Sequence, residues 1–257
     1  MLIDTHCHLY ASEFDEDREA MLQRAKDAGV GKFFLPNIDS SSFDSMIALS
    51  SSHHECFPMM GLHPCSVKEN WNQEISAVEK WLMNPDYKWF GIGETGLDYY
   101  WDKNFIPDQK KNFQQHIDWA RQLHLPIIIH SRDALDDCIE MIRKNKDSTL
   151  SGIFHCFSGT LEQAKQIMSL DFYLGIGGVV TFKNGGLDKV MNEIDLNHVV
   201  LETDSPYLAP VPFRGKRNES SYLKLVVKKI SDIKNIPEEE VGSITTRNAE
   251  KVFRISS

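Results

Sequence analysis

Short runs of β-branched and apolar residues alternate with longer amphipathic stretches along the whole chain. The runs predict eight strands, at residues 2–6, 32–36, 56–62, 89–94, 126–130, 151–155, 172–176 and 199–202. Apolar residues spaced by three and four predict a helix at residues 109–123, and residues 161–169, 186–193 and 222–234 are similar. Gly29 as a stop signal predicts a helix at residues 16–28, and Pro237 followed by three acidic residues predicts one at 237–253. Strands that alternate with helices in this way are typical of a parallel sheet covered by helices.

The chain length suits one large domain of this class. Its 257 residues contain no low-complexity segment, no convincing linker and no close repeat. Eight β/α units in a chain of this length favour a closed barrel over an open sheet. We therefore expect an α/β fold, a single-domain (β/α)₈ TIM barrel that covers residues 1–257.

Composition narrows the function classes only a little. The formal net charge of −9 argues against a protein that coats long duplex DNA through many phosphate contacts. It does not argue against a nuclease, because bound cations can supply positive charge locally. The five cysteines show no CxxC spacing and are expected to be reduced core thiols of a cytoplasmic protein. We see no signal peptide, no segment long enough to span a membrane and no sign of an obligate protein partner.

The first predicted strand carries the first sign of chemistry. Asp4, His6 and His8 are spaced by two, and side chains two apart on an extended chain share a face. His6 and His8 can therefore bind one metal ion together, while Cys7 points the other way. The alternative is two unrelated histidines on a strand, but a His-x-His pair at the end of a strand favours a metal site.

The ends of the other predicted strands repeat this signal. Metal-competent residues end the third, fourth, fifth, sixth and eighth strands: His63, Glu94, His130, His155, and Glu202 with Asp204. A barrel gathers these strand ends into one ring, and barrel active sites lie on that face. We therefore expect His6, His8, Glu94, His130, His155 and Asp204 to converge on metal ions.

The donor set indicates which metals fit. Neutral imidazoles and carboxylates suit Zn²⁺, Mn²⁺, Fe²⁺ or Co²⁺, and Mg²⁺ is less natural among so many histidines. Four histidines and two carboxylates exceed the needs of one tetrahedral ion. They would serve two ions about 3.5–4 Å apart, with Glu94 as the candidate bridge.

Six motifs occur in an order that resembles a known family. DTHCHL, GLHP, GETGLD, HSRDA, FHCFSG and LETDSPYL are similar to the motifs of the TatD family of metal-dependent deoxyribonucleases, which belong to the amidohydrolase-like barrels. The resemblance covers nearly the whole chain, including PFRGKRNE and the closing TTRNAEKVF. Taken together the motifs are highly specific.

The resemblance implies a role for each matching residue. His6, His8 and Asp204 would hold one ion, His130 and His155 the second, and Glu94 would bridge the two. His63 resembles a family histidine near the substrate phosphate, and Arg132, Arg214 and Asn218 lie in motifs that meet a nucleic-acid backbone. Ser220 departs from the family pattern, where proline is usual, and we expect it to alter the stiffness of its loop.

These roles predict hydrolysis of a phosphodiester in DNA, with exonuclease action on single strands or 3′ ends. The cofactors would be two divalent ions, Zn²⁺, Mn²⁺ or Mg²⁺, that lower the pKa of a water molecule. Asp204 would accept the proton of that water as general base. His63 and Arg214 would stabilise negative charge that develops on the phosphate.

Other interpretations stay open at this point. A related barrel enzyme could cleave a small ester, lactone, amide or phosphotriester with the same ligands, although several such relatives use a carboxylated lysine where Glu94 stands. A non-catalytic metal-binding protein is the second alternative. The cluster formed by Arg214, Lys216 and Arg217 could guide a phosphate backbone or be a solvated face. The aromatic run formed by Tyr99, Tyr100 and Trp101 could stack bases or simply pack its loop.

Overall fold

The computed structural model describes residues 1–183 and 185–255, which fall into two compact units. The first unit comprises Met1–Leu35 and Cys156–Ser257, and the second comprises Pro36–His155. Strands alternate with helices throughout both units, and the eight expected strands are all present. The predicted α/β class with eight β/α units is therefore confirmed, while the single-domain organisation and the closure of the barrel stay predictions.

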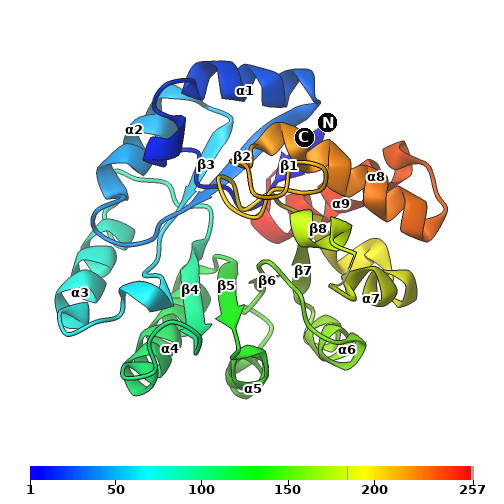
Figure 1. The fold of residues 1–257 in the computed structure, drawn as a ribbon. Helices are drawn as coiled ribbons and strands as arrows, with labels where there is room; N and C mark the ends of the chain where they lie inside the picture. The colour runs from blue at the N-terminus through cyan, green and yellow to red at the C-terminus, as the bar shows by residue number, and fades with distance from the viewer. Residues whose placement is uncertain (184, 256–257) are drawn as a thin grey trace. The chain divides into compact units, whose positions relative to one another are not determined.

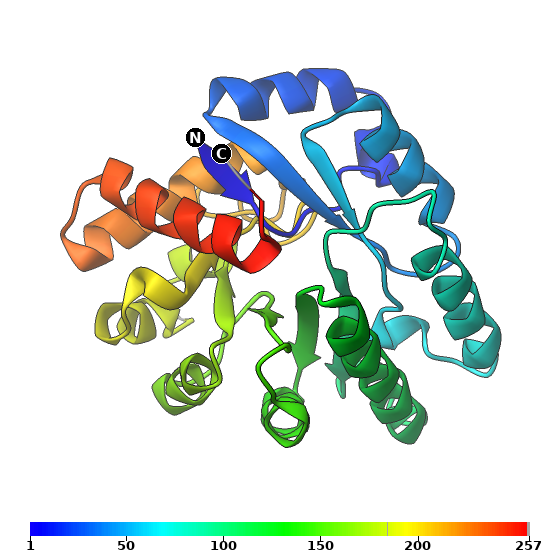
Figure 2. The ribbon, with the colours of Figure 1, turned by 180° about the vertical axis from the view of Figure 1, so that it is seen from behind.

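The first unit contains four parallel strands. β1 pairs with β2, β7 pairs with β8, and the N–H of Thr5, just after β1, donates to the carbonyl of Leu201 at the end of β8. The strands are β1 (Leu2–Asp4), β2 (Val30–Pro36), β7 (Tyr173–Ile176) and β8 (Val199–Leu201). The helices are α1 (Arg18–Asp27), α6 (Leu161–Ser169), α7 (Leu187–Glu193), α8 (Leu223–Lys234) and α9 (Glu238–Phe253). Helix α9, near the C-terminus, packs against β1 and β8 of this unit, and both views show it (Figures 1 and 2).

The second unit repeats the same plan with four more strands. β4 and β5 pair in parallel, β5 pairs with β6, and Met60 after β3 bridges to Ile92 of β4. The strands are β3 (Cys56–Met59), β4 (Ile92–Asp98), β5 (Ile127–Arg132) and β6 (Gly152–Phe154). The helices are α2 (Phe43–Ser52), α3 (Trp71–Leu82), α4 (Ile106–Leu123) and α5 (Leu135–Asn145).

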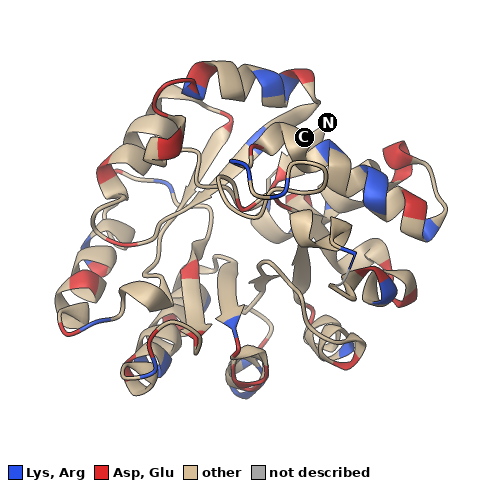
Figure 3. Cartoon of the chain, viewed as in Figure 1, with Lys and Arg blue, Asp and Glu red and all other residues tan. Residues whose placement is uncertain are grey.

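The strands are apolar and buried. The strand residues Phe33, Ile92, Ile128, Leu174 and Val200 are completely buried, and helices pack against strands in both units, for example α4 on β4 and α9 on β8. Charged residues of both signs instead occur along the helices, while the strands are mostly uncharged (Figure 3). The polar residues that do occur at strand ends therefore stand out as candidates for function.

One predicted boundary was wrong in a way that matters for the site. We expected the fourth strand at residues 89–94, but β4 begins at Ile92 and continues to Asp98. Its late residues pair with β5, with Gly96 opposite His130 and Asp98 opposite Arg132. Gly96, which follows the predicted end of the strand, thus lies inside β4. Glu94 therefore lies within β4, and Asp98 ends it.

Helix α4 fixes the backbone just ahead of His63. The Nε2 of His116 accepts a hydrogen bond from the N–H of Leu62 at 3.0 Å, and its Nδ1–H donates to the carbonyl of Asn112 at 2.8 Å. The side-chain amide of Asn112 donates to the carbonyl of Leu62 at 3.1 Å. Both backbone groups of Leu62 are thus held by one helix, which positions the next residue along the chain.

This arrangement requires a neutral imidazole, because Nε2 of His116 must accept. Burial lowers the pKa of His116 to about 4. The unfolded chain would bind a proton near pH 6.5, whereas the folded chain would not. Stability is therefore full above about pH 6.5 and is lost as the pH falls toward 4, by about 3 kcal/mol in all.

We predict that His116→Gln, which cannot titrate, removes this part of the pH dependence. Urea unfolding of the wild type and the variant between pH 7 and pH 4.5 measures the difference, and all other titrating groups cancel in it. The wild type should lose stability relative to the variant as the pH falls. A difference in the free energy of unfolding between wild type and variant that stays constant with pH would contradict the role given to His116.

Candidate metal centre

The first unit brings three of the expected ligands together. The Nε2 atoms of His6 and His8 lie 3.3 Å apart. The Oδ1 of Asp204 lies 3.7 Å from the first and 3.5 Å from the second. Both imidazoles are buried, and the carboxylate is only 15% exposed. Two nitrogens and one oxygen therefore face a common point.

These separations fit a cation bound between the three atoms. A metal ion with tetrahedral angles and bonds of about 2.0–2.1 Å to nitrogen would hold its ligand nitrogens about 3.3 Å apart. Two neutral imidazoles that face each other can share only one hydrogen between them, whereas both can offer a lone pair to a metal. The donor chemistry of His6, His8 and Asp204 therefore fits a divalent ion such as Zn²⁺.

Backbone hydrogen bonds hold the two ligand-bearing segments in place. The N–H of Asp204 donates to the carbonyl of His6 at 2.9 Å, and the N–H of His8 donates to the carbonyl of Ser205 at 2.7 Å. Asp204 has a φ of 57°, in the left-handed region that aspartate adopts more readily than most residues. The chain after β1 and the chain after β8 are therefore joined directly beside the ligands.

A second carboxylate, Asp4, lies beneath this cluster and is completely buried. It accepts hydrogen bonds from the hydroxyl of Thr203 at 2.6 Å, the hydroxyl of Ser220 at 2.7 Å and the backbone N–H of Thr203 at 3.0 Å. Burial raises the pKa of Asp4 to about 7, although these hydrogen bonds act in the opposite direction. Ser220, which we expected to alter loop stiffness more than chemistry, thus donates to a buried carboxylate two residues before His6.

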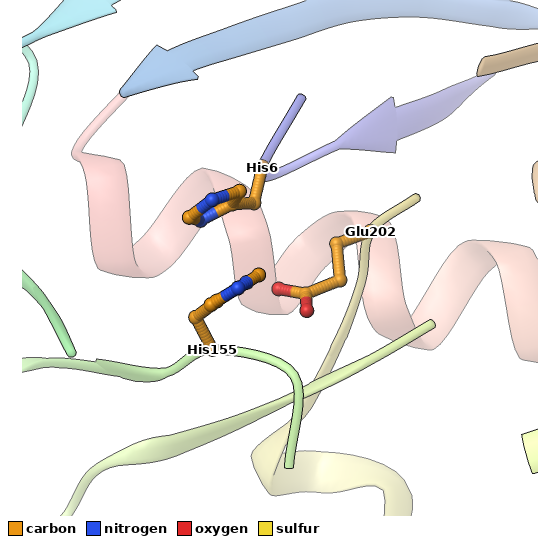
Figure 4. A group of neighbouring side chains, drawn as sticks. All are labelled: His6, His155 and Glu202. Atoms are coloured by element: carbon orange, nitrogen blue, oxygen red, sulfur yellow. The ribbon is translucent and has the colours of Figure 1, made fainter. Parts of the chain in front are cut away.

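Glu202 is a further buried carboxylate near His6. One of its oxygens lies within 4.8 Å of a ring nitrogen of His6, and its side chain extends from the segment after β8 (Figure 4). Its Oε1 accepts a hydrogen bond from the N–H of Cys156 at 2.6 Å. Space for this carboxylate comes from Gly175 on β7, where an added Cβ would lie 2.2 Å from Oε2.

The second unit brings together Glu94, His130 and His155, the other three expected ligands. The Oε1 of Glu94 lies 3.0 Å from Nδ1 of His130 and 3.7 Å from Nε2 of His155. Glu94 and His155 are almost completely buried. Gly96 permits this approach, because a Cβ there would lie 2.1 Å from the carbonyl oxygen of His130. The bridging role of Glu94 stays a prediction.

Asp98 orients His130 from the other side of its ring. Its Oδ2 accepts a hydrogen bond from Nε2 of His130 at 2.9 Å. Burial raises the pKa of Asp98, but the hydrogen bonds from His130 and from the backbone of Trp101 and Tyr100 outweigh it, so that the pKa lies below its usual range. A carboxylate that holds one imidazole nitrogen leaves the other to a metal, an arrangement common among metal-binding histidines.

His63 lies beside the same cluster, but its ring is arranged as a donor. Its Nδ1 accepts a hydrogen bond from the N–H of Cys65 at 3.0 Å, so the neutral ring carries its hydrogen on Nε2. That nitrogen is 3.3 Å from Oε1 of Glu94. Burial lowers the pKa of His63, and the charge of Glu94 outweighs this and raises it. An N–H donor beside metal ligands is suited to hold a substrate oxygen.

The expected substrate-binding residues differ in exposure. Arg132 and Arg214 are exposed, and Arg214 lies over the ring of Phe182 at 4.4 Å. Asn218 is completely buried, and its side-chain amide donates to the carbonyls of Thr203 and Tyr207, both at 2.7 Å. These contacts favour a role for Asn218 in bracing the loop that carries Asp204 over direct contact with phosphate.

The three residues of the basic cluster after β8, Arg214, Lys216 and Arg217, also differ in their contacts and exposure. Arg217 donates to both oxygens of Asp17, at 2.7 and 2.8 Å, and this pair lowers the pKa of Asp17. Arg214 and Lys216 are exposed instead. Arg217 therefore anchors the loop to the segment before α1, and Arg214 is the better candidate for a phosphate contact.

Comparison with known proteins agrees with this geometry. A family model described as TatD related DNase matches residues 3–254. The chain belongs to the TatD-related DNase family. It is 38% identical over 257 residues to an uncharacterized metal-dependent hydrolase, YabD, of Bacillus subtilis, and the match covers 100% of both chains.

Solved structures of other proteins share the fold of this chain. The crystal structure of YjjV, a TatD homologue from Escherichia coli, matches with a TM-score of 0.93 and 28% identity over 99% of this chain and 98% of that one. An uncharacterized amidohydrolase from Saccharomyces cerevisiae matches with a TM-score of 0.80 and 18% identity over 98% and 99% of the two chains, which shows a shared fold.

The TatD-family chain described here is thus a metal-dependent hydrolase. Its clusters of histidines and carboxylates suit divalent metals. Among the described residues, no helix combines the length and the apolar character needed to cross a membrane. The cytoplasmic location expected from the sequence stays a prediction.

Sequence reasoning missed two carboxylates of this TatD-family site. Glu202 was visible at the end of a predicted strand, two residues before Asp204, but was given no role. Asp98 was hidden by the wrong boundary of β4, since a residue placed in a loop is not expected to face a ligand on the next strand. The signal that could have found it is its position in GETGLD, four residues after Glu94 and therefore on the same face of an extended chain.

We predict that Ser220→Ala destabilises the protein by about 1–3 kcal/mol, because it removes a donor from the buried carboxylate of Asp4. Urea unfolding at pH 8, where Asp4 is charged, measures the loss. Ser169→Ala on the exposed end of α6 is the matched control and should change stability by less than about 0.5 kcal/mol. Equal effects of the two substitutions would show that the hydroxyl of Ser220 does not support Asp4.

Proposed function

We propose that this TatD-family hydrolase cleaves phosphodiester bonds in DNA and uses two divalent ions, one for each ligand cluster. The observation that carries the proposal is His63, whose hydrogen is directed to Nε2 by the N–H of Cys65, beside the cluster of Glu94 and His130. Such a fixed donor suits an anionic phosphate oxygen. The match to a family described as TatD related DNase supports the same substrate.

Asp204 is the proposed general base. Water attacks the phosphorus atom and its proton passes to the carboxylate of Asp204. The bond from phosphorus to the leaving oxygen breaks as that oxygen takes a proton from solvent water, and Asp204 then returns its own proton to solvent. The carboxylate is 15% exposed, so a water molecule can reach it, unlike the completely buried Asp4 and Glu202. When bound, divalent metals at such sites polarise the phosphate and acidify the attacking water.

We propose that Arg214 contacts a phosphate group of the DNA. Its guanidinium is exposed and lies over the ring of Phe182. Arginine pairs well with phosphate because its planar N–H groups match the phosphate oxygens. With a net charge of −9, the protein depends on such local contacts and on its metals for DNA binding.

The competing function is hydrolysis of a small ester, lactone or amide. The amidohydrolase-type fold accommodates such reactions, so the fold alone does not separate the two. A substrate panel separates them: an end-labelled single strand, a labelled duplex and a set of small esters and lactones. Each is incubated with chelated protein before and after addition of Mg²⁺, Mn²⁺ or Zn²⁺.

We expect metal-dependent loss of terminal nucleotides from the single strand, and at least about a hundredfold slower loss with Asp204→Asn, the usual scale for a missing general base. Asp232→Asn on the exposed face of α8 is the control and should keep full activity. Circular dichroism and metal analysis check that Asp204→Asn folds and retains its metals. Turnover of small esters alone, or a normal rate for Asp204→Asn, would reject the proposal.

The role of Arg214 is tested by the salt dependence of binding. Removal of one phosphate contact should weaken DNA binding and reduce the slope of log affinity against log salt by about 1. We expect this for Arg214→Ala, measured by fluorescence polarisation of a labelled strand. Arg143→Ala on the exposed face of α5 is the charge-matched control, and an Arg214→Ala slope equal to that of the control would reject the contact.

A further inference from the structure

Three side chains lie together just after β4 and at the end of β5 and are here called the aromatic platform: Tyr100, Trp101 and Arg132. The guanidinium carbon of Arg132 lies 3.7 Å from the centre of the Tyr100 ring and 5.2 Å from that of Trp101. The two rings meet edge to face, with centres 4.9 Å apart. The platform therefore presents flat π-surfaces together with a positive charge.

The platform is unusually open for aromatic side chains. Trp101 is 68% exposed and Tyr100 is 52% exposed. Their neighbour Tyr99 is different, because its hydroxyl donates to Asp137 at 2.6 Å and Lys110 lies over its ring. Loop packing thus accounts for Tyr99 but leaves more than half of each of the other two side chains exposed, and a flat ligand would relieve the cost of hydrating their apolar surface.

Asp98 connects the platform to the metal ligand His130. Its Oδ1 accepts hydrogen bonds from the backbone N–H groups of Tyr100 at 2.9 Å and Trp101 at 3.1 Å. Its Oδ2 accepts from His130 at 2.9 Å. One buried carboxylate therefore sets both the loop that carries the rings and the imidazole that binds metal.

The third member of the platform is fixed to the same ligand through β5. Arg132 and His130 are two residues apart on that strand, share a face and lie about 7 Å from each other along it. The N–H of Tyr99 also donates to the carbonyl of Arg132 at 2.9 Å. A backbone held by these hydrogen bonds loses little conformational freedom on binding, so more of the contact energy becomes affinity.

We propose that the aromatic platform stacks one unpaired nucleobase of the DNA substrate and so places a phosphate of that strand at the His130 cluster. The proposal rests on the proposed nuclease function and names the part of the substrate that the second unit recognises. Every base has a flat π-face, so stacking tolerates any sequence. It requires an unpaired base, because neighbouring base pairs cover both faces of a base inside a duplex.

The chemistry of the three residues favours a base over other occupants. Aromatic rings and the guanidinium plane of arginine are the usual stacking partners of exposed bases. The charge of Arg132 also suits the adjoining phosphate, and its guanidinium already lies over the ring of Tyr100. A purely apolar partner would gain nothing from a charged group at the centre of the surface.

The test is a cycle that combines substitutions in the protein with abasic sites in the DNA. Labelled single strands carry one abasic residue at the first, second or third position from either end. Binding is measured by fluorescence polarisation with metal-loaded protein in an Asp204→Asn background, so that strands bind without being cut. At one position, loss of the base should weaken binding about tenfold, the scale of a single stacking contact.

The variants then ask whether the platform provides that tenfold difference. In Tyr100→Leu and Trp101→Leu, which keep apolar volume but lose the π-face, the intact and abasic strands should bind within about twofold of each other. Tyr100→Phe keeps the ring and should keep the full difference, as should Arg143→Ala, the exposed control on α5. Arg132→Lys, which keeps the charge without the plane, should reduce the difference.

The outcomes separate this proposal from the proposed function. If the wild type cleaves DNA but no abasic position matters, or the tenfold difference persists in Tyr100→Leu and Trp101→Leu, the platform does not stack a base and the nuclease assignment stands. If no strand is bound or cleaved, both proposals fall. Loss of the difference in the two leucine variants together with its retention in Tyr100→Phe and Arg143→Ala establishes the platform.

Discussion

The second unit's site depends on the two oxygens of one buried carboxylate. Asp98 accepts from the imidazole of His130 with one oxygen and from two loop N–H groups with the other. A buried charge is tolerated only when its lone pairs are satisfied, so the loop and the ring are held to fixed positions together. The ligand and the exposed aromatic side chains are thereby parts of one hydrogen-bonded unit.

The first unit meets the same constraint with different residues. Asp4 is solvated by Thr203 and Ser220, which come from the chain after β8. Those donors draw the Asp204 segment against the start of the chain, and the backbone pairing of Asp204 with His6 completes the contact. In each unit a buried carboxylate outside the proposed ligand set, Asp4 or Asp98, thus positions the proposed metal ligands.

The sequence predicted the elements well because periodicity reports burial directly. All eight strands and the six helices given by range appear, and the ligand positions at strand ends follow from the two-residue repeat of an extended chain. It predicted the supporting residues poorly. Asp98, Ser220 and the clamp of His116 on Leu62 act through contacts between segments far apart or between a strand and a helix, and no local pattern encodes such a pairing.

Because Gly175 has no side chain, it limits which residues relatives in this family can carry at positions 175 and 202. The carboxylate of Glu202 occupies the volume that any larger residue at 175 would need, since a Cβ there would overlap Oε2. The two positions therefore share one volume across adjacent strands. In a relative with a shorter acid at position 202, a methyl group at position 175 would fit, so the residues at these two positions should change together. Replacing the segment that carries only one of the two positions by that of such a relative would displace the acid beside His6.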